Sequence, residues 1–152
     1  MRQLIRYLLL ALLFALAGPL RAAGQDPRQE AVAMVHKAVA MLAASGREKT
    51  IAEANNPKGR FVERDLYVVI HDMHGKVLAN PVLPRMVGIE LAGVKDVDGK
   101  MFIKERLEML KTTNNGWIDF KWPNSVTTQI EKRSVYFERA GDLVITCGIP
   151  KY

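Results

Sequence analysis

The segment "NNGWIDFKWPNSV", residues 114–126, contains both tryptophans of the chain together with a phenylalanine and a proline. Along a β-strand, successive side chains point to opposite faces of the sheet. Read as a strand, this segment has an apolar face made of Ile118, Phe120 and Trp122, and a mixed face made of positions 117, 119 and 121. Two interpretations of the aromatic face are open: packing in a core, or the wall of a ligand pocket.

Two more strands are expected directly after this segment. "QIEKRSVYFER", roughly residues 129–139, and "DLVITCGI", residues 142–149, are rich in β-branched and aromatic residues, and Gly141 lies at the turn between them. Upstream, "DLYVVIHD" (65–72) and "KVLAN" (76–80) read as a hairpin that turns at Gly75. Strands joined by short turns indicate an antiparallel sheet.

Helices are predicted at three places. Asp26 and Pro27 form a helix start, and a stripe of apolar residues at three-to-four spacing follows: Val32, Val35, Val39 and Leu42. Shorter helices are expected over 47–56 and 101–112, and 81–100 reads as an ordered loop that crosses one face of the sheet. The fold class is therefore α+β: an antiparallel sheet of about five strands, with the helices on one side and the long N-terminal helix packed on the sheet.

The first 24 residues have the layout of a secretory signal peptide. Arg2 and Arg6 precede an apolar run over 7–17, and Ala22, Ala23 and Gly24 offer a cleavage site. The alternative is an uncleaved membrane anchor, but the apolar run is shorter than the roughly 20 residues that span a bilayer. We expect a signal peptide over 1–24 and a single periplasmic domain over 25–152.

The charge balance does not favour a nucleic-acid partner. The chain carries a formal charge of +6, and removal of Arg2, Arg6 and Arg21 with the signal peptide would leave about +3. The sequence also lacks the motifs of common hydrolases, a zinc signature and a phosphate-binding loop. We expect no catalytic residues, no metal and no cofactor.

Several residues that could have a chemical role have simpler structural explanations. Cys147 is the single cysteine and lies in an apolar strand, which favours a buried thiol. His71 and His74 flank a turn, but no third group of metal ligands accompanies them. Asp98 is expected to cap the following helix, whereas Asp96 stays a weak candidate for a pocket.

Three segments together resemble the single Cache domain family, the PAS-like extracytoplasmic small-molecule sensor domains of bacteria. They are "VVIHDMHGKVLANP", "GVKDVDGKMFIKE" and "GWIDFKWPNSVTTQIEKRSVYFERAGDLVITCGI", and the best-matched block runs over 116–148. The resemblance covers most of residues 30–150. It implies a PAS-like sheet, a long N-terminal helix and a ligand pocket on one face of the sheet.

The resemblance also implies which side chains line the pocket. The family typically has tyrosine at Phe120, lysine at Arg133 and histidine at Asn80, so this chain departs from the pattern at three positions. Arginine keeps the positive charge and adds a planar fork that suits a carboxylate. With Arg133 as the charge partner of a small organic acid, the remaining expected ligand-binding residues are Tyr67, Asn80, Asp96, Phe120, Trp122 and Tyr136.

Two functional classes stay open at this stage. The first is an exported domain that binds a small organic acid and has no output module of its own, and that would signal through a membrane-bound protein. The second is a periplasmic interaction or regulatory subunit that binds no metabolite. A pocket near Arg133 and Trp122 would favour the first, and a filled sheet face with an exposed apolar patch the second. Homodimerisation through the first helix is compatible with either.

Overall fold

The computed structural model describes residues 26–124 and 127–151, so the predicted signal peptide over 1–24 lies outside the described residues. Within those ranges, none of the helices is both long and apolar enough to cross a bilayer. The elements follow one another in this order: α2 (Pro27–Ser45), α3 (Arg47–Ala54), β1 (Val62–Glu63), β2 (Leu66–Asp72), β3 (Val77–Ala79), η1 (Pro84–Met86), α4 (Phe102–Met109), β4 (Asn115–Pro123), β5 (Ile130–Ala140) and β6 (Leu143–Pro150).

A single antiparallel sheet organises the domain, as the sequence predicts. Its strands lie in the order β1-β2-β6-β5-β4, and β3 pairs with the remaining part of β2. Strands β4, β5 and β6 form the expected meander, and β6 then pairs with β2 along Val68–Asp72. The two-residue strand β1 was not predicted, because so short a pairing leaves no periodic pattern in the sequence.

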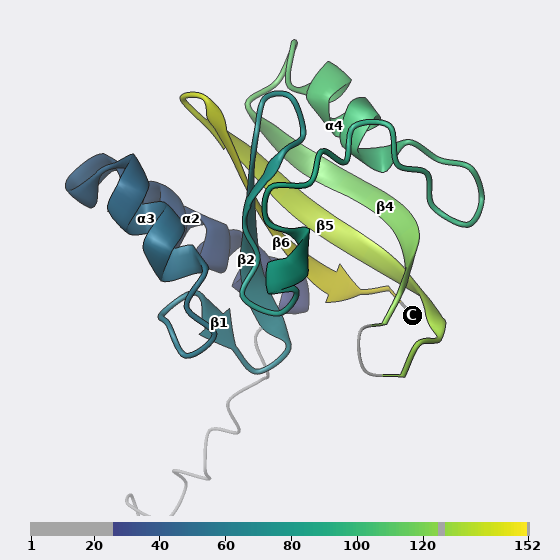
Figure 1. Ribbon diagram of the computed structural model, residues 1–152, viewed down its shortest axis with the longest axis horizontal. Helices are drawn as coiled ribbons and strands as arrows, with labels where there is room; N and C mark the ends of the chain where they lie inside the picture. Colours follow the sequence, from purple (N-terminus) through teal and green to yellow (C-terminus); the bar gives the residue numbers. More distant parts are fainter. Residues whose placement is uncertain (1–25, 125–126, 152) are drawn as a thin grey trace, which may run out of the picture.

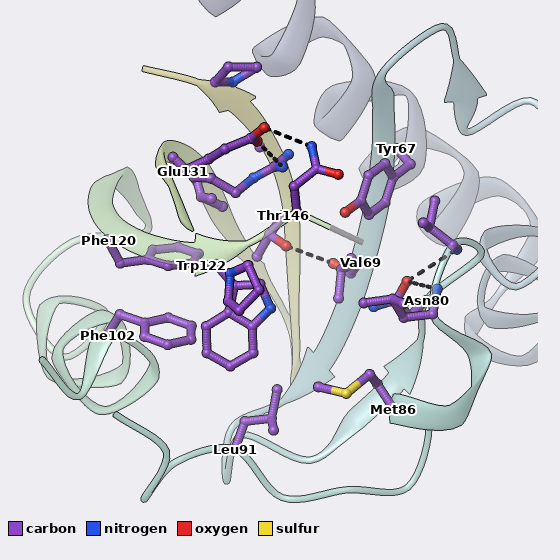
Figure 2. Close-up of a pocket in the computed structure, with 18 of the residues that line it drawn as sticks. Tyr67, Val69, Asn80, Met86, Leu91, Phe102, Phe120, Trp122, Glu131 and Thr146 are labelled. Atoms are coloured by element: carbon purple, nitrogen blue, oxygen red, sulfur yellow. Dashed lines mark hydrogen bonds and ion pairs between the residues drawn. The ribbon is translucent and has the colours of Figure 1, made fainter. Parts of the chain in front are cut away.

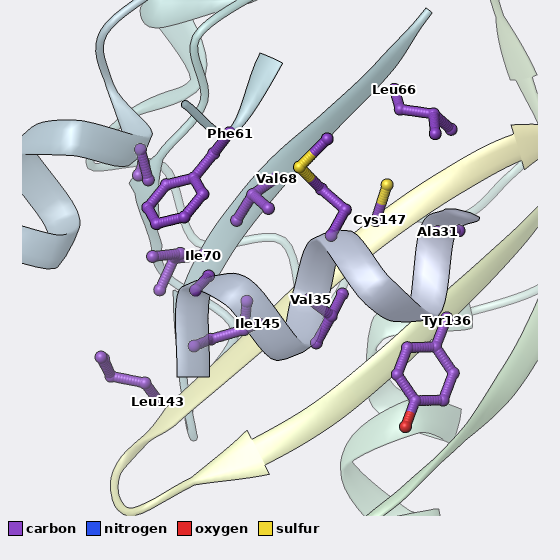
Figure 3. Packing of buried hydrophobic residues seen from close by; sticks show 14 of the residues in the cluster. Ala31, Val35, Phe61, Leu66, Val68, Ile70, Tyr136, Leu143, Ile145 and Cys147 are labelled. Carbon is purple, nitrogen blue, oxygen red and sulfur yellow. The ribbon is translucent and has the colours of Figure 1, made fainter. Parts of the chain in front are cut away.

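Helix α2 begins where the sequence predicts and covers one face of the sheet (Figure 1). The side chain of Asp26 accepts a hydrogen bond of 3.0 Å from the backbone N–H of Arg28, and Pro27 occupies the first turn, where no partner for its nitrogen is needed. The helix buries Ala31, Met34, Val35 and Ala38. Figure 3 shows this face lying over Val68, Ile145 and Cys147, which confirms the packing of α2 on the sheet.

The prediction that all helices lie on one side of the sheet is wrong. Helix α4 covers the opposite face of the sheet (Figure 1). There Phe102 and Ile103 pack in a second core with Ile118, Val135 and Phe137. The physical reason is that the central strands are buried on both faces: every residue of 134–137 and of 143–147 is buried. A strand with two buried faces needs a layer on each side.

Asp98 does not cap α4, so that prediction is also wrong. The N-cap position is Met101, which makes no capping hydrogen bond through its side chain. The carboxylate of Asp98 instead lies 2.8 Å from the ammonium of Lys121 on β4. This ion pair attaches the loop before α4 to the edge strand.

Candidate ligand-binding site

A pocket of about 730 Å³ lies on the α4 face of the sheet. Its floor comes from β2, β4, β5 and β6, and α4 contributes to its wall. The loop predicted to cross one face of the sheet lines it with Val82, Leu83, Met86 and Leu91. Figure 2 shows Phe102, Phe120 and Trp122 on one side of this pocket, with Tyr67 and Asn80 on the opposite side.

The aromatic face of β4 forms one wall of the pocket and packs on α4 at the same time. Phe120 stacks on Phe102 with ring centroids 4.0 Å apart and planes within 10°. Trp122 meets the ring of Phe102 edge-on at 5.4 Å. The segment therefore contributes to both a core and a pocket: Ile118 is buried in the core, while Phe120 and Trp122 line the pocket.

Arg133 lines the pocket, as expected, and lies beside the aromatic wall because it pairs with Phe120 across the β4–β5 ladder. Its side chain is 17% exposed, and its nearest carboxylate is Glu131, with Nη1 and Oε2 4.0 Å apart. Glu131 in turn accepts a 2.8 Å hydrogen bond from the amide of Asn124. Within the described ranges the guanidinium of Arg133 makes no hydrogen bond, and the 4.0 Å contact with Glu131 is its shortest ion pair. Its N–H donors are therefore available to a ligand.

Tyr67 and Asn80 also line the pocket. The Oδ1 atom of Asn80 accepts hydrogen bonds from the N–H groups of Val82 (3.2 Å) and Leu83 (2.8 Å), which fixes the start of the loop. The Asn80 amide nitrogen and the Tyr67 hydroxyl have no hydrogen-bond partner in the part of the chain that the structure describes. Both can therefore donate to a bound molecule.

Tyr136 does not line the pocket, so its predicted place beside Arg133 is wrong. It lies three residues after Arg133 in a strand without a register shift, and therefore on the opposite face of the sheet. There it packs against α2 (Figure 3). Its hydroxyl donates a 3.1 Å hydrogen bond to Glu138. Burial and the neighbouring Glu138 raise the pKa of Tyr136 to about 12.

Asp96 does not line the pocket either; its carboxylate binds backbone N–H groups instead. Its carboxylate accepts hydrogen bonds from the backbone N–H groups of Asp98 and Lys100, both at 2.9 Å, and of Lys121 at 3.0 Å. These bonds, that of Lys121 first, hold the pKa of Asp96 below its ordinary value. Asp96 thus closes the turn over 96–100 and fastens it to β4.

Arg106 on α4 is a pocket residue that the sequence analysis missed. It is only 3% exposed, and its Nη1 donates to Nε2 of His71 at 2.9 Å. The Nδ1 of His71 lies 2.9 Å from the carbonyl oxygen of Asp72, to which it donates when Nε2 is the acceptor. A signal existed in the sequence: Arg106 shares one helical face with Phe102, Ile103 and Leu110, all of which are buried.

Positive charge predominates around the pocket. Five cationic and two anionic side chains line it: Arg64, Arg106, Lys132, Arg133 and Lys151 against Asp65 and Glu131. Two of the cations already have partners, because Arg64 lies 2.8 Å from Glu30 and Lys151 contacts Asp119. The remaining cations favour an anionic ligand.

Cys147 is a buried thiol, as the sequence predicts. Cys147 is 1% exposed, and burial raises the pKa of its thiol to about 12. No group of three or more histidine, cysteine, aspartate or glutamate side chains that could hold a metal ion occurs in residues 26–124 and 127–151.

Residues 21–149 match the family model of the single Cache domain 2. The chain belongs to this family. Cache domains of this kind are non-catalytic, ligand-binding extracytoplasmic sensor domains, so the domain is a sensor module and not an enzyme. The family and the α+β sheet agree with the resemblance seen in the sequence.

Solved structures show the same fold at low sequence identity. A methyl-accepting chemotaxis protein from Vibrio parahaemolyticus aligns with a TM-score of 0.67 and 23% identity, covering 81% of this chain and 87% of that one. The periplasmic sensor domain of a chemotaxis protein aligns with a TM-score of 0.64 and 18% identity over 82% and 90% of the two chains. A Cache chemosensory domain studied for carboxylic acid recognition gives 0.64 and 18%, over 82% and 88%.

Proposed function

We propose that this Cache domain senses a small carboxylate, which binds in the pocket with its acidic group on Arg133. The observation that carries the proposal is a guanidinium that lines the pocket, 4.0 Å from its nearest carboxylate, beside the wall formed by Phe120 and Trp122. A similar fold has been studied for carboxylic acid recognition in another Cache domain, which supports the same ligand class here.

The residues that line the pocket would make different kinds of contact with the ligand. Arg133 offers a charged, planar pair of donors, which is the geometry that a carboxylate accepts. Tyr67 and Asn80, on the other side of the pocket, offer a hydroxyl and an amide donor without partners among the described residues. The aromatic wall excludes water, which strengthens each of these hydrogen bonds. The pocket near Arg133 and Trp122 also favours a sensor over a pure interaction subunit, by the criterion set from the sequence.

Replacement of Arg133 by glutamine tests this proposal. A hydrogen bond to a charged group contributes about 1.5–3 kcal/mol, so Arg133→Gln should weaken carboxylate binding about tenfold to a hundredfold. Isothermal titration calorimetry of the purified protein against a series of short monocarboxylates measures this. Arg139→Gln is the matched control, because Arg139 lies on the same strand, is exposed and does not line the pocket.

Two results would contradict the proposal. If Arg133→Gln keeps the fold and the wild-type affinity, the guanidinium is a structural or surface charge. If no carboxylate of the series binds the wild type, the carboxylate proposal fails for this chain.

We also propose that the domain reaches the periplasm by means of a cleaved signal peptide over 1–24, which leaves a mature domain from residue 25. The basic start, the apolar run and the small residues at 22–24 support this, as does the fold shared with a periplasmic sensor domain. Mass spectrometry of the mature N-terminus tests it. A chain that still begins at Met1 in the membrane fraction would instead support the anchor.

A further inference from the structure

Arg106 is a buried cation for which the described protein supplies no counter-ion. No carboxylate lies within 4.0 Å of its guanidinium in residues 26–124 and 127–151, and its buried Nε has no hydrogen-bond partner there. The carbon of the guanidinium lies 5.6 Å from the ring centroid of Phe137, so one neighbour is an aromatic side chain. Because arginine stays charged at neutral pH, a full positive charge lies at the pocket wall.

The side-chain partner of Arg106 cannot neutralise it. His71 accepts the 2.9 Å hydrogen bond through Nε2, so its imidazole must be neutral. Burial and the nearby Arg106 charge lower the pKa of His71 to about 3, which agrees with this protonation state. A purely structural role, tying α4 to β2, would need only a polar side chain at position 106. A buried charge without an anion is costly to a protein, and an anion in the pocket would remove that cost.

The sheet register sets the distance between Arg106 and Arg133. The Arg133 side chain leans over β6, since a Cβ atom at Gly148 would lie 3.6 Å from its Nη2. Arg106 contacts His71, which pairs with Val144, four residues from Gly148, and it lies near Phe137, which pairs with Thr146. With a rise of about 3.3 Å per residue, the sheet positions that lie beside the two guanidinium groups are roughly 7–13 Å apart along β6.

This spacing fits a molecule with an acidic group at each end. In an extended four-carbon diacid the two carboxyl carbons are about 4 Å apart, from three carbon–carbon bonds of about 1.5 Å. A guanidinium in a two-point contact adds about 4 Å at each end, because the N–O distance is about 2.8 Å. The sum of about 12 Å lies inside the range set by the register.

We propose that Arg106 binds a second acidic group of the ligand, and that the domain is selective for short dicarboxylates over monocarboxylates. This inference rests on the proposed function, in which Arg133 binds the first carboxylate. It adds a specificity-determining residue at the α4 side of the pocket and narrows the ligand class.

Calorimetric titration of the wild-type protein with succinate and with butyrate provides the first test. The two acids have the same chain length and differ in one carboxylate. We expect succinate to bind at least tenfold more tightly. This comparison needs no variant, so it stays decisive if a substitution at position 106 prevents folding. Equal affinities for the two acids would overturn the dicarboxylate proposal and leave the role of Arg133 intact.

Substitution of Arg106 provides the second test. Arg106→Gln keeps a donor for His71 but removes the charge, so succinate affinity should fall to that of butyrate while butyrate affinity is unchanged. Lys104→Gln is the matched control, because Lys104 is an exposed cation on the same helix. If Arg106→Gln weakens both acids equally, Arg106 acts through the fold and the proposal is wrong. If neither acid nor any other carboxylate binds the wild type, the proposed function itself fails, and this inference fails with it.

Discussion

The buried imidazole of His71 should make the domain lose stability in mildly acidic solution. His71 is 2% exposed, and burial, together with the adjacent Arg106 charge, lowers its pKa to about 3 from an ordinary value near 6.5. Below pH 6.5 the unfolded chain therefore binds a proton that the folded chain does not. The free energy of unfolding falls as the pH drops from 6.5 toward 3, and the loss from this group ends below that value.

The magnitude follows from the size of the pKa shift. Each pH unit inside the window costs about 1.4 kcal/mol, so His71 should lower the free energy of unfolding by about 2 kcal/mol between pH 7 and pH 5. Carboxylates whose pKa is lowered in the fold, such as Asp96 and Asp119, contribute in the same direction. A variant at position 71 separates the histidine from these groups, because they are common to both proteins.

His71→Gln is that variant, since its amide oxygen can accept the hydrogen bond from Arg106. Urea denaturation at pH 7 and pH 5 should show a loss smaller by about 2 kcal/mol in His71→Gln than in the wild type. His74→Gln is the control for the loss of an exposed imidazole on the neighbouring turn and should follow the wild type. If the wild type and His71→Gln lose the same free energy of unfolding between the two pH values, the buried neutral imidazole is refuted.

Two further predictions concern the contact of Asn55 with the β3 segment and the buried thiol of Cys147. The side chain of Asn55 donates to the carbonyl of Leu78 at 3.0 Å and accepts from the N–H of Asn80 at 3.1 Å, so Asn55→Ala should lower the free energy of unfolding by about 1–3 kcal/mol in urea denaturation. The exposed Asn114→Ala is its control, and a loss equal to that control would contradict the prediction. Cys147, whose thiol has a pKa raised by burial to about 12, should react with a disulfide reagent at neutral pH only after the domain unfolds. Rapid labelling of the folded protein would show that the strand opens.

The sequence predicts most of the local structure because local structure has local causes. Helix α2 starts at Asp26 and Pro27. The Asp26 side chain accepts a hydrogen bond from the backbone N–H two residues later, and Pro27 has no N–H that would need a partner. The alternation along β4 correctly places Phe120 and Trp122 on the pocket face and Trp117 on the opposite face, since the side-chain direction in a strand depends only on position. The same rule, applied to Arg133 and Tyr136, would have placed them on opposite faces and excluded Tyr136 from the pocket.

The remaining errors concern contacts between distant parts of the chain. The hydrogen bond between Arg106 and His71 joins residues 35 positions apart, and no pattern inside α4 identifies its partner. Asp96 was chosen for its charge, but backbone N–H groups, including one on β4 25 positions away, take up its carboxylate. The place of β6 between β2 and β5 rests on backbone pairing with a strand about 75 residues earlier, which the order of elements does not reveal.

The central position of β6 has a consequence for how the domain must fold. β6 is the last of the described strands in the chain, yet it lies in the middle of the sheet and pairs with both β2 and β5. During synthesis, the N-terminal half and the β4–β5 hairpin can each form local structure, but neither can join the other until residues 143–150 have left the ribosome. Pairing across such long separations is slow. The partly made chain therefore stays in an open form, in which the edges of β2 and β5 are exposed to proteases and chaperones.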